Sequence, residues 1–431
     1  MKIRSLMLTF LMMTAGMLHA QQKITLDLAG ARKTALEYNK TVANSGLAVD
    51  KANMAVREAI ANGLPQLNAA VDYSNALGAK ISIRFNEAMP ASEIDIKPQS
   101  NFNLSLTQLI FSGNYIVGVQ TARLYQTMAG MNQEKTSLEI VAQVTDAYHL
   151  VLISEELLKL LTQNLDNLDK LYTKTVALGT FGIIEQTDVD QLLVQVNTLK
   201  NAVNSSQRQL ELATNMLRLI LGVSVDTELE LTESLDDLVR MSEGSSPVTE
   251  KFSIDDQIDF RMISQQEMVS RKMIDMRRAN ALPTISGFYQ YTYKLLKPDF
   301  DMTPANIVGL QMNIPIFSSG VRSAQVKQAR IDLETARNNK SLLSEQIQVQ
   351  EKQLRYNYNS ALETYLNQKS NVEVSRRVYS SLKVKYEQGV ISGLDLITAD
   401  NNYVRAETDY ITAMLQLLQS KVQLEKLYGK L

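Results

Sequence analysis

The sequence of 431 residues contains no cysteine and no tryptophan, and only two histidines, His19 and His149. The lack of cysteine excludes disulfides, thiolate nucleophiles and cysteine-ligated metals. Catalytic signatures are missing too: there is no glycine-rich phosphate loop, no nucleophile elbow and no His-Glu metal-binding cluster. We therefore expect no cofactor, no metal site and no enzyme activity.

An excess of charge of one sign is also lacking. The chain has 44 Lys and Arg against 46 Asp and Glu, which gives a formal net charge of -2. Nucleic-acid-binding proteins usually present a basic surface, so no nucleic-acid partner is expected. Beyond the N-terminus there is no apolar run of about 18 residues, the length that a membrane-spanning helix needs. Entry into a membrane would therefore require β-strands.

The N-terminus has the pattern of a secretory signal peptide over residues 1–20. Lys2 and Arg4 precede an apolar run from Leu6 to Leu18, and the small Ala20 stands at the expected cleavage point. The run is shorter than the ~20 residues that a membrane anchor needs. We expect this segment to be cleaved as the protein leaves the cytoplasm.

Four segments, two in each half of the chain, alternate apolar and polar residues. In one of them every second residue from Leu67 to Tyr73 is apolar. A period of two is typical of a β-strand with one apolar and one polar face. Strands are therefore expected over about 65–75, 100–111, 284–294 and 305–317.

Between and after these strands, apolar residues recur every seven residues over long stretches. The rows run from Val144 to Tyr172, Val189 to Leu217, Tyr358 to Tyr386 and Ile397 to Leu418. A seven-residue period is typical of helices that pack along their length, as in a coiled coil. Breaks near Gly179 and Gly389 divide each stretch into two arms. We therefore expect long helical hairpins over 114–222 and 318–428.

The two halves show the same order of predicted elements: helix, strand, loop, strand, long helix, break and helix. Short motifs recur at matching places, ANGLP at 61–65 with ANALP at 279–283, and FSG at 111–113 with FSSG at 317–320. This self-similarity indicates an internal duplication. We predict a first repeat over 21–222, an acidic connector over 223–253 and a second repeat over 254–431.

Strands of this length could cross a bilayer at a tilt, or could form an ordinary antiparallel sheet packed on a helix. Four strands cannot close a barrel alone, and open edges cannot face lipid, because unpaired backbone groups there cost several kcal/mol each. If the strands enter a membrane, several chains must share one barrel. The residues themselves do not fix the number of chains.

Taken together, these features resemble the TolC-like outer membrane efflux protein family. The resemblance rests on the duplicated layout and on three motifs: LSLTQLIFSG at 104–113, MNIPIFSSG at 312–320, and YEQG at 386–389 followed by LDLI at 394–397. It implies a mixed α+β membrane protein. In this architecture a homotrimer forms a twelve-stranded β-barrel in the outer membrane lipid, continued by a long α-helical barrel of coiled-coil hairpins.

In that family such a chain is a passive exit duct of a tripartite efflux or type I secretion system. A periplasmic adaptor (membrane fusion) protein and an inner-membrane transporter complete the path. The resemblance therefore implies this function, and a location in the outer membrane extending into the periplasm. The residues leave a second class open, a structural or adhesive helical stalk of the cell envelope. A stalk would explain the seven-residue rows but not strands of membrane length.

The resemblance also indicates residues of the channel constriction. Asp395 matches the first of two acidic residues, three apart, that the family often carries there, while Thr398 occupies the second position. Asp188 and Asp400 are secondary candidates. Copies of one carboxylate around a symmetry axis would concentrate negative potential and favour cations. The alternative for Asp395 is a helix cap that favours the helix dipole.

The hairpin tips are the candidate contact with the adaptor. They are marked by Gly179, Gly182, Tyr386 and Gly389. In the family such tips meet the adaptor protein. The alternative is plain turn chemistry, because glycine tolerates a positive φ.

Overall fold

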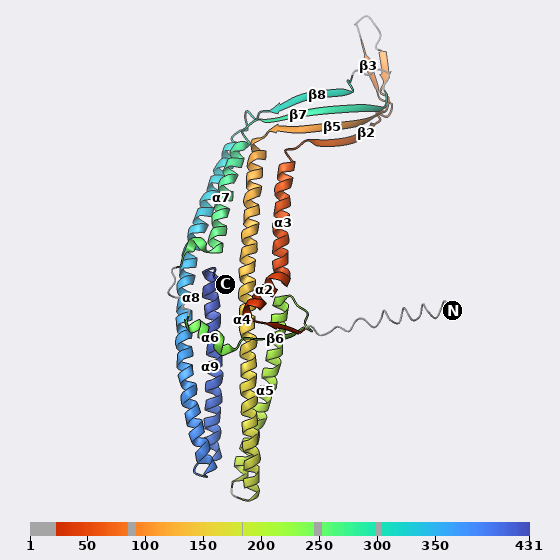
Figure 1. Ribbon diagram of the computed structural model, residues 1–431. Coiled ribbons are helices and arrows are strands. Elements are labelled where there is room, and N and C mark those ends of the chain that lie inside the picture. Colours follow the sequence, from red (N-terminus) through yellow and green to blue (C-terminus); the bar gives the residue numbers. More distant parts are fainter. Residues whose placement is uncertain (1–22, 85–91, 183, 245–251, 298–302) are drawn as a thin grey trace, which may run out of the picture. The chain divides into compact units, whose positions relative to one another are not determined.

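A computed structural model describes residues 23–84, 92–182, 184–244, 252–297 and 303–431. The predicted signal peptide lies outside the described residues, as does part of the predicted connector. The chain divides into two compact units, whose elements are labelled in Figure 1. A helical unit comprises Met1–Gly46, Asn132–Phe260 and Leu343–Leu431, and a sheet unit comprises Leu47–Met131 and Arg261–Leu342. Each unit draws on both predicted repeats, so packing divides the chain differently from the repeated order of elements.

The sheet unit contains a four-stranded antiparallel sheet in the order β2-β5-β7-β8. Its strands are β2 (Gln66–Ser74), β5 (Gln99–Phe111), β7 (Thr284–Leu296) and β8 (Asn306–Asn313). The last is shorter than the predicted 305–317. Pro315 explains the early end, because proline has no N–H to donate to a neighbouring strand.

A separate antiparallel pair, β3 (Lys80–Ile83) and β4 (Ser92–Asp95), lies in a segment that the sequence indicated only as a polar loop. Its strands have four residues each, too few for a clear alternating pattern. Ile81 pairs with Ile94, and Lys80 Nζ lies 3.1 Å from the Glu93 carboxylate. Lys80 Nζ also lies 3.9 Å from the Asp95 carboxylate, so two exposed ion pairs accompany the paired isoleucines.

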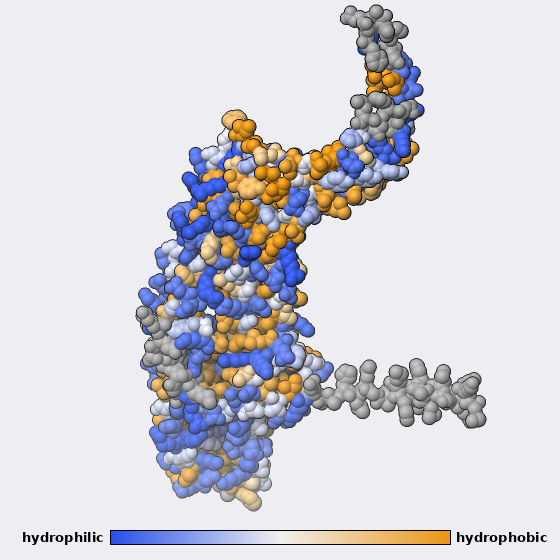
Figure 2. Space-filling model, turned by 45° about the horizontal axis from the view of Figure 1, so that its top comes forward, coloured by the Kyte–Doolittle hydropathy of each residue, from blue (hydrophilic) through white to orange (hydrophobic). Residues whose placement is uncertain are grey.

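One face of the four-stranded sheet is apolar, and none of the described residues covers it. The register aligns Leu106, Tyr289 and Val308 on this face. Val308 and Leu310 are 81% and 77% exposed. In Figure 2 hydrophobic residues gather over this part of the chain. Soluble monomers rarely expose so continuous an apolar surface.

The opposite face of the sheet carries hydrogen-bonded polar side chains. Asn103 on β5 donates through Nδ2 to Asp72 on β2 at 2.6 Å, and accepts at Oδ1 from Thr292 on β7 at 2.8 Å. The two faces therefore have the opposite character that the alternation predicts.

The sheet unit also contains most of α3 (Lys40–Ala61) and of α7 (Ile258–Ala279), and the first parts of α4 (Gly113–Thr180) and α8 (Val321–Glu387). Ile274 of α7 packs with Ala329 and Leu333 of α8 in a small buried cluster. Among the described residues, none of the helices is both long and apolar enough to cross a membrane.

In the helical unit, α4 and α8 pack with their returning arms, α5 (Gln186–Leu221) and α9 (Gly393–Leu427). The predicted seven-residue rows supply buried residues on all four helices. Val144, Leu217, Tyr358 and Leu418 are at most 2% exposed. The long apolar rows thus hold the helices together, as expected for coiled-coil-like packing.

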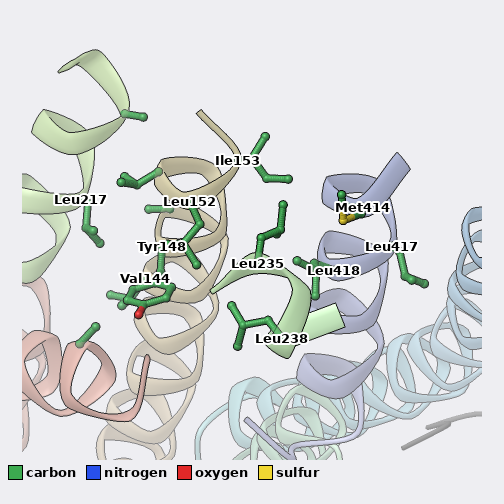
Figure 3. Packing of buried hydrophobic residues seen from close by; sticks show 14 of the residues in the cluster. Val144, Tyr148, Leu152, Ile153, Leu217, Leu235, Leu238, Met414, Leu417 and Leu418 are labelled. Carbon is green, nitrogen blue, oxygen red and sulfur yellow. The ribbon is translucent and has the colours of Figure 1, made fainter. Parts of the chain in front are cut away.

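The middle of the helical unit is more elaborate than the predicted connector. It includes β6 (Glu228–Leu231), which pairs in parallel with β1 (Lys23–Leu26), then α6 (Leu235–Gly244) and a short 3-10 turn, η2 (Ile254–Asp256). Leu235 and Leu238 of α6 lie between α4 and α9 (Figure 3). Tyr148 of α4 donates its hydroxyl to the Leu26 carbonyl at 3.3 Å. The segment is therefore part of the core and not only a link.

The helix predicted ahead of the first strand is divided in two, because the chain breaks at Asn39 between α2 (Leu28–Tyr38) and α3. Asn39 Oδ1 accepts the backbone N–H of Thr41 at 2.8 Å, which caps the start of α3. Its Nδ2 donates to the Ile220 carbonyl at 2.7 Å, near the end of α5. One side chain therefore satisfies backbone groups of two helices.

Gly222 ends α5 at the same place. Its φ of +76° is left-handed, and a Cβ at this position would clash with the Tyr38 carbonyl group. Gly429 follows α9 with φ +68°, but a Cβ there would meet no atom within 4 Å, so open space surrounds it. The two glycines therefore share a conformation and differ in their surroundings.

We expect Gly222→Ala to destabilise the protein more than Gly429→Ala. Both changes place a side chain at left-handed φ, which costs about 1–2 kcal/mol. Only Gly222→Ala also forces a clash with backbone, adding about 1–3 kcal/mol. Thermal unfolding of the detergent-solubilised variants, followed by circular dichroism, measures the difference. Equal losses of Tm would contradict the role given to the close approach at Tyr38.

Candidate functional site

The turns that join the hairpin arms lie at the same end of the helical unit (Figure 1). Gly182 and Gly389 have φ of +73° and +74°. The N–H of Gly182 donates to the Gly179 carbonyl and that of Gly389 to the Tyr386 carbonyl, both at 2.9 Å. The turn chemistry considered from the sequence is therefore present at both tips.

Contacts between α4 and α8 hold the two tips together. The Thr175 hydroxyl lies 3.1 Å from the Tyr386 hydroxyl, and Thr175 is fully buried. Nearby, Lys174 Nζ lies 4.0 Å from the Glu387 carboxylate. Tyr386 therefore has a structural partner in the first hairpin, which the sequence did not reveal.

Asp395 forms a capping box with Ser392 at the start of α9. The Ser392 hydroxyl donates to Asp395 Oδ2 at 2.7 Å, and the Asp395 N–H donates to the Ser392 hydroxyl at 3.3 Å. This satisfies backbone groups that a helix start leaves unpaired. Asp395 nevertheless remains exposed, and it lines a groove of 580 Å³ between α8 and α9. The capping role is thus present, and the carboxylate still faces open space.

Asp188 lies in the first turn of α5, where a negative charge favours the helix dipole. Its carboxyl carbon is 3.7 Å from the position that a Cβ on Gly393 would take. The structure therefore brings Asp188 next to Gly393 at the start of α9. Gly393 precedes Asp395 by two residues. Of the three candidate carboxylates, these two share one region of the tips.

Asp400 differs from the other two because it lies inside the α8–α9 pair. It is 7% exposed and hydrogen-bonds with Tyr379 of α8. Burial, together with the nearby charge of Glu407, raises the pKa of Asp400 to about 6, against the opposing effects of the Tyr379 hydrogen bond and the Lys383 charge. Asp400 can therefore affect the packing of α8 against α9, but it does not line the groove beside Asp395.

Around Asp400 a polar network crosses the helix pair. The Tyr379 and Tyr403 rings stack at 5.6 Å between centroids, and Tyr403 bonds to Glu407. Arg376 of α8 donates through Nε to the Tyr403 hydroxyl at 3.2 Å and lies 3.7 Å from the Glu407 carboxylate. Sequence reasoning missed this network. The available signal was the seven-residue spacing of Asp400 and Glu407, which places two acids on one stripe beside the apolar row.

Comparison with known proteins gives a consistent picture. The sequence model described as "Outer membrane efflux protein" matches residues 31–223 and 255–430. The chain is similar to the toluene efflux pump outer membrane protein TtgC of Pseudomonas putida, with 24% identity over 308 residues, which are 69% of this chain and 62% of TtgC. It is also similar to the outer membrane protein TolC of Escherichia coli, with 20% identity over 412 residues, 93% of this chain and 81% of TolC.

Two solved structures have a similar fold. CusC aligns with a TM-score of 0.76 at 16% identity, covering 93% of this chain and 92% of CusC. VceC of Vibrio cholerae aligns with a TM-score of 0.74 at 15% identity, covering 93% of this chain and 96% of VceC. The chain thus matches these structures along most of its length, while the match to TtgC spans less than two thirds of that protein.

We expect Asp400→Asn to stabilise the protein at pH 8 but not at pH 4. The pKa of Asp400 in the folded protein, about 6, lies above its usual 3.8, so folding favours the protonated carboxyl. The contribution is fully present below about pH 4 and is lost as the pH rises through 6, at a cost of up to roughly 3 kcal/mol. Asparagine stays neutral and can still accept a hydrogen bond from Tyr379.

Thermal unfolding of both proteins from pH 4 to pH 8 measures this effect. Asp409→Asn is the control, because Asp409 lies on the same helix with its side chain 51% exposed. A stability gain that does not change with pH would contradict a buried, titrating Asp400.

Proposed function

The chain belongs to the outer membrane efflux protein family, and from this premise we propose that it is the outer membrane channel of a tripartite efflux or type I secretion system. It is a passive exit duct that spans the outer membrane and extends into the periplasm. The observation that carries this proposal is the four-stranded sheet, which, among the described residues, leaves an apolar face exposed and the outer edges of β2 and β8 unpaired.

The sheet supports a barrel shared between copies of the chain. β2 and β8 each pair on one side only. Unpaired edges in lipid are costly, and closure removes them. We infer that β8 of one chain pairs with β2 of the next, and that three chains form a twelve-stranded barrel with the apolar face toward lipid and the Asn103 side toward water.

The helical unit supports the same ring. Leu212, Met216 and Leu219 follow one face of α5 and are 69%, 54% and 68% exposed. Val349 and Tyr356, seven residues apart on α8, are 65% and 74% exposed. Two unlike apolar surfaces on one chain favour a head-to-tail contact, and such contacts form a ring when the rotation between neighbouring copies closes. A homotrimer covers both surfaces along the periplasmic tunnel.

The periplasmic adaptor and the inner-membrane transporter are the proposed partners, as expected for a component of such a pump. We propose that the adaptor contacts the tips around Gly179, Gly182, Tyr386 and Gly389. Besides the groove beside Asp395, a second groove of 340 Å³ lies at the tips between α5 and α9. Val194 and Leu394 line it and are 65% and 56% exposed. Apolar side chains of the adaptor could pack into these two grooves beside the turns.

Asp395 and Asp188 are the proposed constriction residues, and Asp400 contributes from within the hairpin. An enzyme activity is not proposed, and no observation favours the helical stalk considered from the sequence. In a stalk surrounded by water, the apolar face and open edges of this sheet would favour aggregation.

We expect the purified protein to conduct ions in planar bilayers, with Asp395 controlling block by cations. Loss of three symmetry-related charges in Asp395→Asn should weaken block by a trivalent lanthanide ion roughly tenfold. Asparagine can still accept the capping hydrogen bonds, whereas Asp395→Ala removes both charge and cap.

Single-channel recordings with both variants separate the two roles of Asp395. If block weakens only in Asp395→Ala, the effect comes from the lost cap and the constriction role is wrong. Asp409→Ala, on the same helix, serves as the control and should leave block unchanged. Absence of any conductance in the folded wild-type protein would overturn the proposed function itself.

We expect a crosslinker at the tip to capture the adaptor. The chain has no cysteine, so Phe181→Cys, at an 80% exposed position, provides a unique attachment point. Asn357→Cys is the control, since it is exposed on α8 and lies about 45 Å along the helix from the tip. Mass spectrometry of crosslinked products from intact cells should find a periplasmic adaptor with the first variant only. Equal capture from both positions would count against docking at the tips.

A further inference from the structure

A set of polar contacts joins α8 to α9, beginning about two turns after α9 starts at Gly393. Tyr379 of α8 hydrogen-bonds with Asp400 of α9, and its ring stacks on Tyr403 within 9° of parallel. Arg376 of α8 contacts both the Tyr403 hydroxyl and the Glu407 carboxylate. We call the set of Arg376, Tyr379, Asp400, Tyr403 and Glu407 the polar seam. Along two turns of α9, polar groups thus form much of the contact with α8.

The polar seam contains two carboxyl groups and one guanidinium group. Asp400 is 7% exposed and the Glu407 side chain 13% exposed, and Glu407 Oε2 is buried without a hydrogen-bond partner among the described residues. When both acids are ionised, the negative charges outnumber the positive charge by one. The charge of Lys383 on α8 offsets part of this excess at Asp400, whereas Glu156 of α4 adds to it at Glu407. Because a buried uncompensated charge is costly, the closed seam favours a neutral carboxyl.

The neighbouring face of α9 has a different character. There Ile397 and Val404 pack with Leu161 of α4 and Leu199 of α5 in an apolar cluster. The burial of hydrocarbon does not involve a proton, so this contact does not respond directly to pH. Of the two contacts of α9, the one with α8 is therefore the one that a proton can weaken or strengthen.

The burial of Asp400 comes from its own chain. A neighbouring copy in the proposed homotrimer can add to this burial but cannot expose the carboxyl group. The seam therefore differs from the apolar rows on α5 and α8, whose exposure depends on assembly.

We propose that Asp400 is a proton-controlled contact that opens and closes the packing of α8 against α9. With the carboxyl group protonated, the two helices are closed along the polar seam. When the proton is lost, water enters to solvate the carboxylate and α8 separates from α9 there, while α9 stays packed on α4 and α5.

Opening of the seam also changes the groove beside Asp395. Val378 and Ala399 line this groove, and they are the chain neighbours of Tyr379 and Asp400. The shape of the groove therefore follows the state of the seam. Any effect on the adaptor rests on the proposed function, whereas the opening itself does not.

Linkage gives the direction of the pH dependence. The pKa of Asp400 is about 6 in the closed seam and 3.8 in water, so opening releases a proton. Burial also raises the pKa of Glu407, which acts in the same direction. Opening is therefore least frequent below about pH 4. The opening constant should rise roughly tenfold between pH 5 and pH 8, and level off above about pH 7.

Hydrogen exchange measured by mass spectrometry on the full detergent-solubilised protein tests this proposal. Rates are divided by the intrinsic exchange rate at each pH, because amide exchange is itself catalysed by base. The protection of segments 374–386 and 396–407 should fall roughly tenfold from pH 5 to pH 8. Segment 189–203 of α5 is the internal control and should keep its protection.

Three variants identify the group that titrates. Asp400→Asn should remove the pH dependence, whereas Asp409→Asn, at an exposed position of the same helix, should keep it. Tyr379→Phe should move the plateau to higher pH, because the lost hydrogen bond favours the ionised form of Asp400. A merely structural loss would lower protection at every pH without moving the plateau. Thermal unfolding confirms that each variant is folded.

Three results would overturn the proposal. Protection that stays constant from pH 5 to pH 8 would mean that the seam does not open. The same fall in Asp400→Asn would assign the titration to another group. An equal fall in the α5 segment would mean a general loosening of the helical unit. Since exchange requires neither an adaptor nor a current, each of these results would leave the proposed function standing.

Discussion

The burial of α4 is the constraint on which the helical unit depends. Its apolar surface is shared between α5, α9 and the short elements α2, β1 and α6, and Val144 and Tyr148 are completely buried among them. Because neighbouring helices pack along α4, their own exposed faces are fixed too. The uncovered row on α5 and the meeting of the two tips both follow from how α4 is surrounded.

Much of this arrangement could be read from periodicity. A period of two located the four long strands, and a period of seven located both hairpins, because regular spacing places side chains on one face whatever their partners are. The middle of the helical unit could not be read in the same way. β1, β6 and α6 are short, and the pairing of β1 with β6 joins Leu26 to Leu231 across about half of the sequence. Such a contact leaves no local pattern.

The site was predictable to a smaller degree. The resemblance pointed to Asp395 and to the glycines of the tips, and the capping box at Ser392 could be recognised from residue types alone. The partners of these residues could not. Thr175 meets Tyr386, and Arg376 meets Glu407, through helix–helix packing whose rotation and offset the sequence does not state. Burial also separates Asp400 from Asp395, although the two lie only five residues apart.

The break at Asn39 has a consequence for how this chain can change. One amide group completes the start of α3 and the end of α5, while the neighbouring backbone leaves no room for a side chain at Gly222. Neither position can be altered alone without disturbing the other, since a shift that admits a larger residue at 222 pulls Asn39 away from Ile220. Substitutions at positions 39 and 222, which lie far apart in the sequence, are therefore expected to occur together.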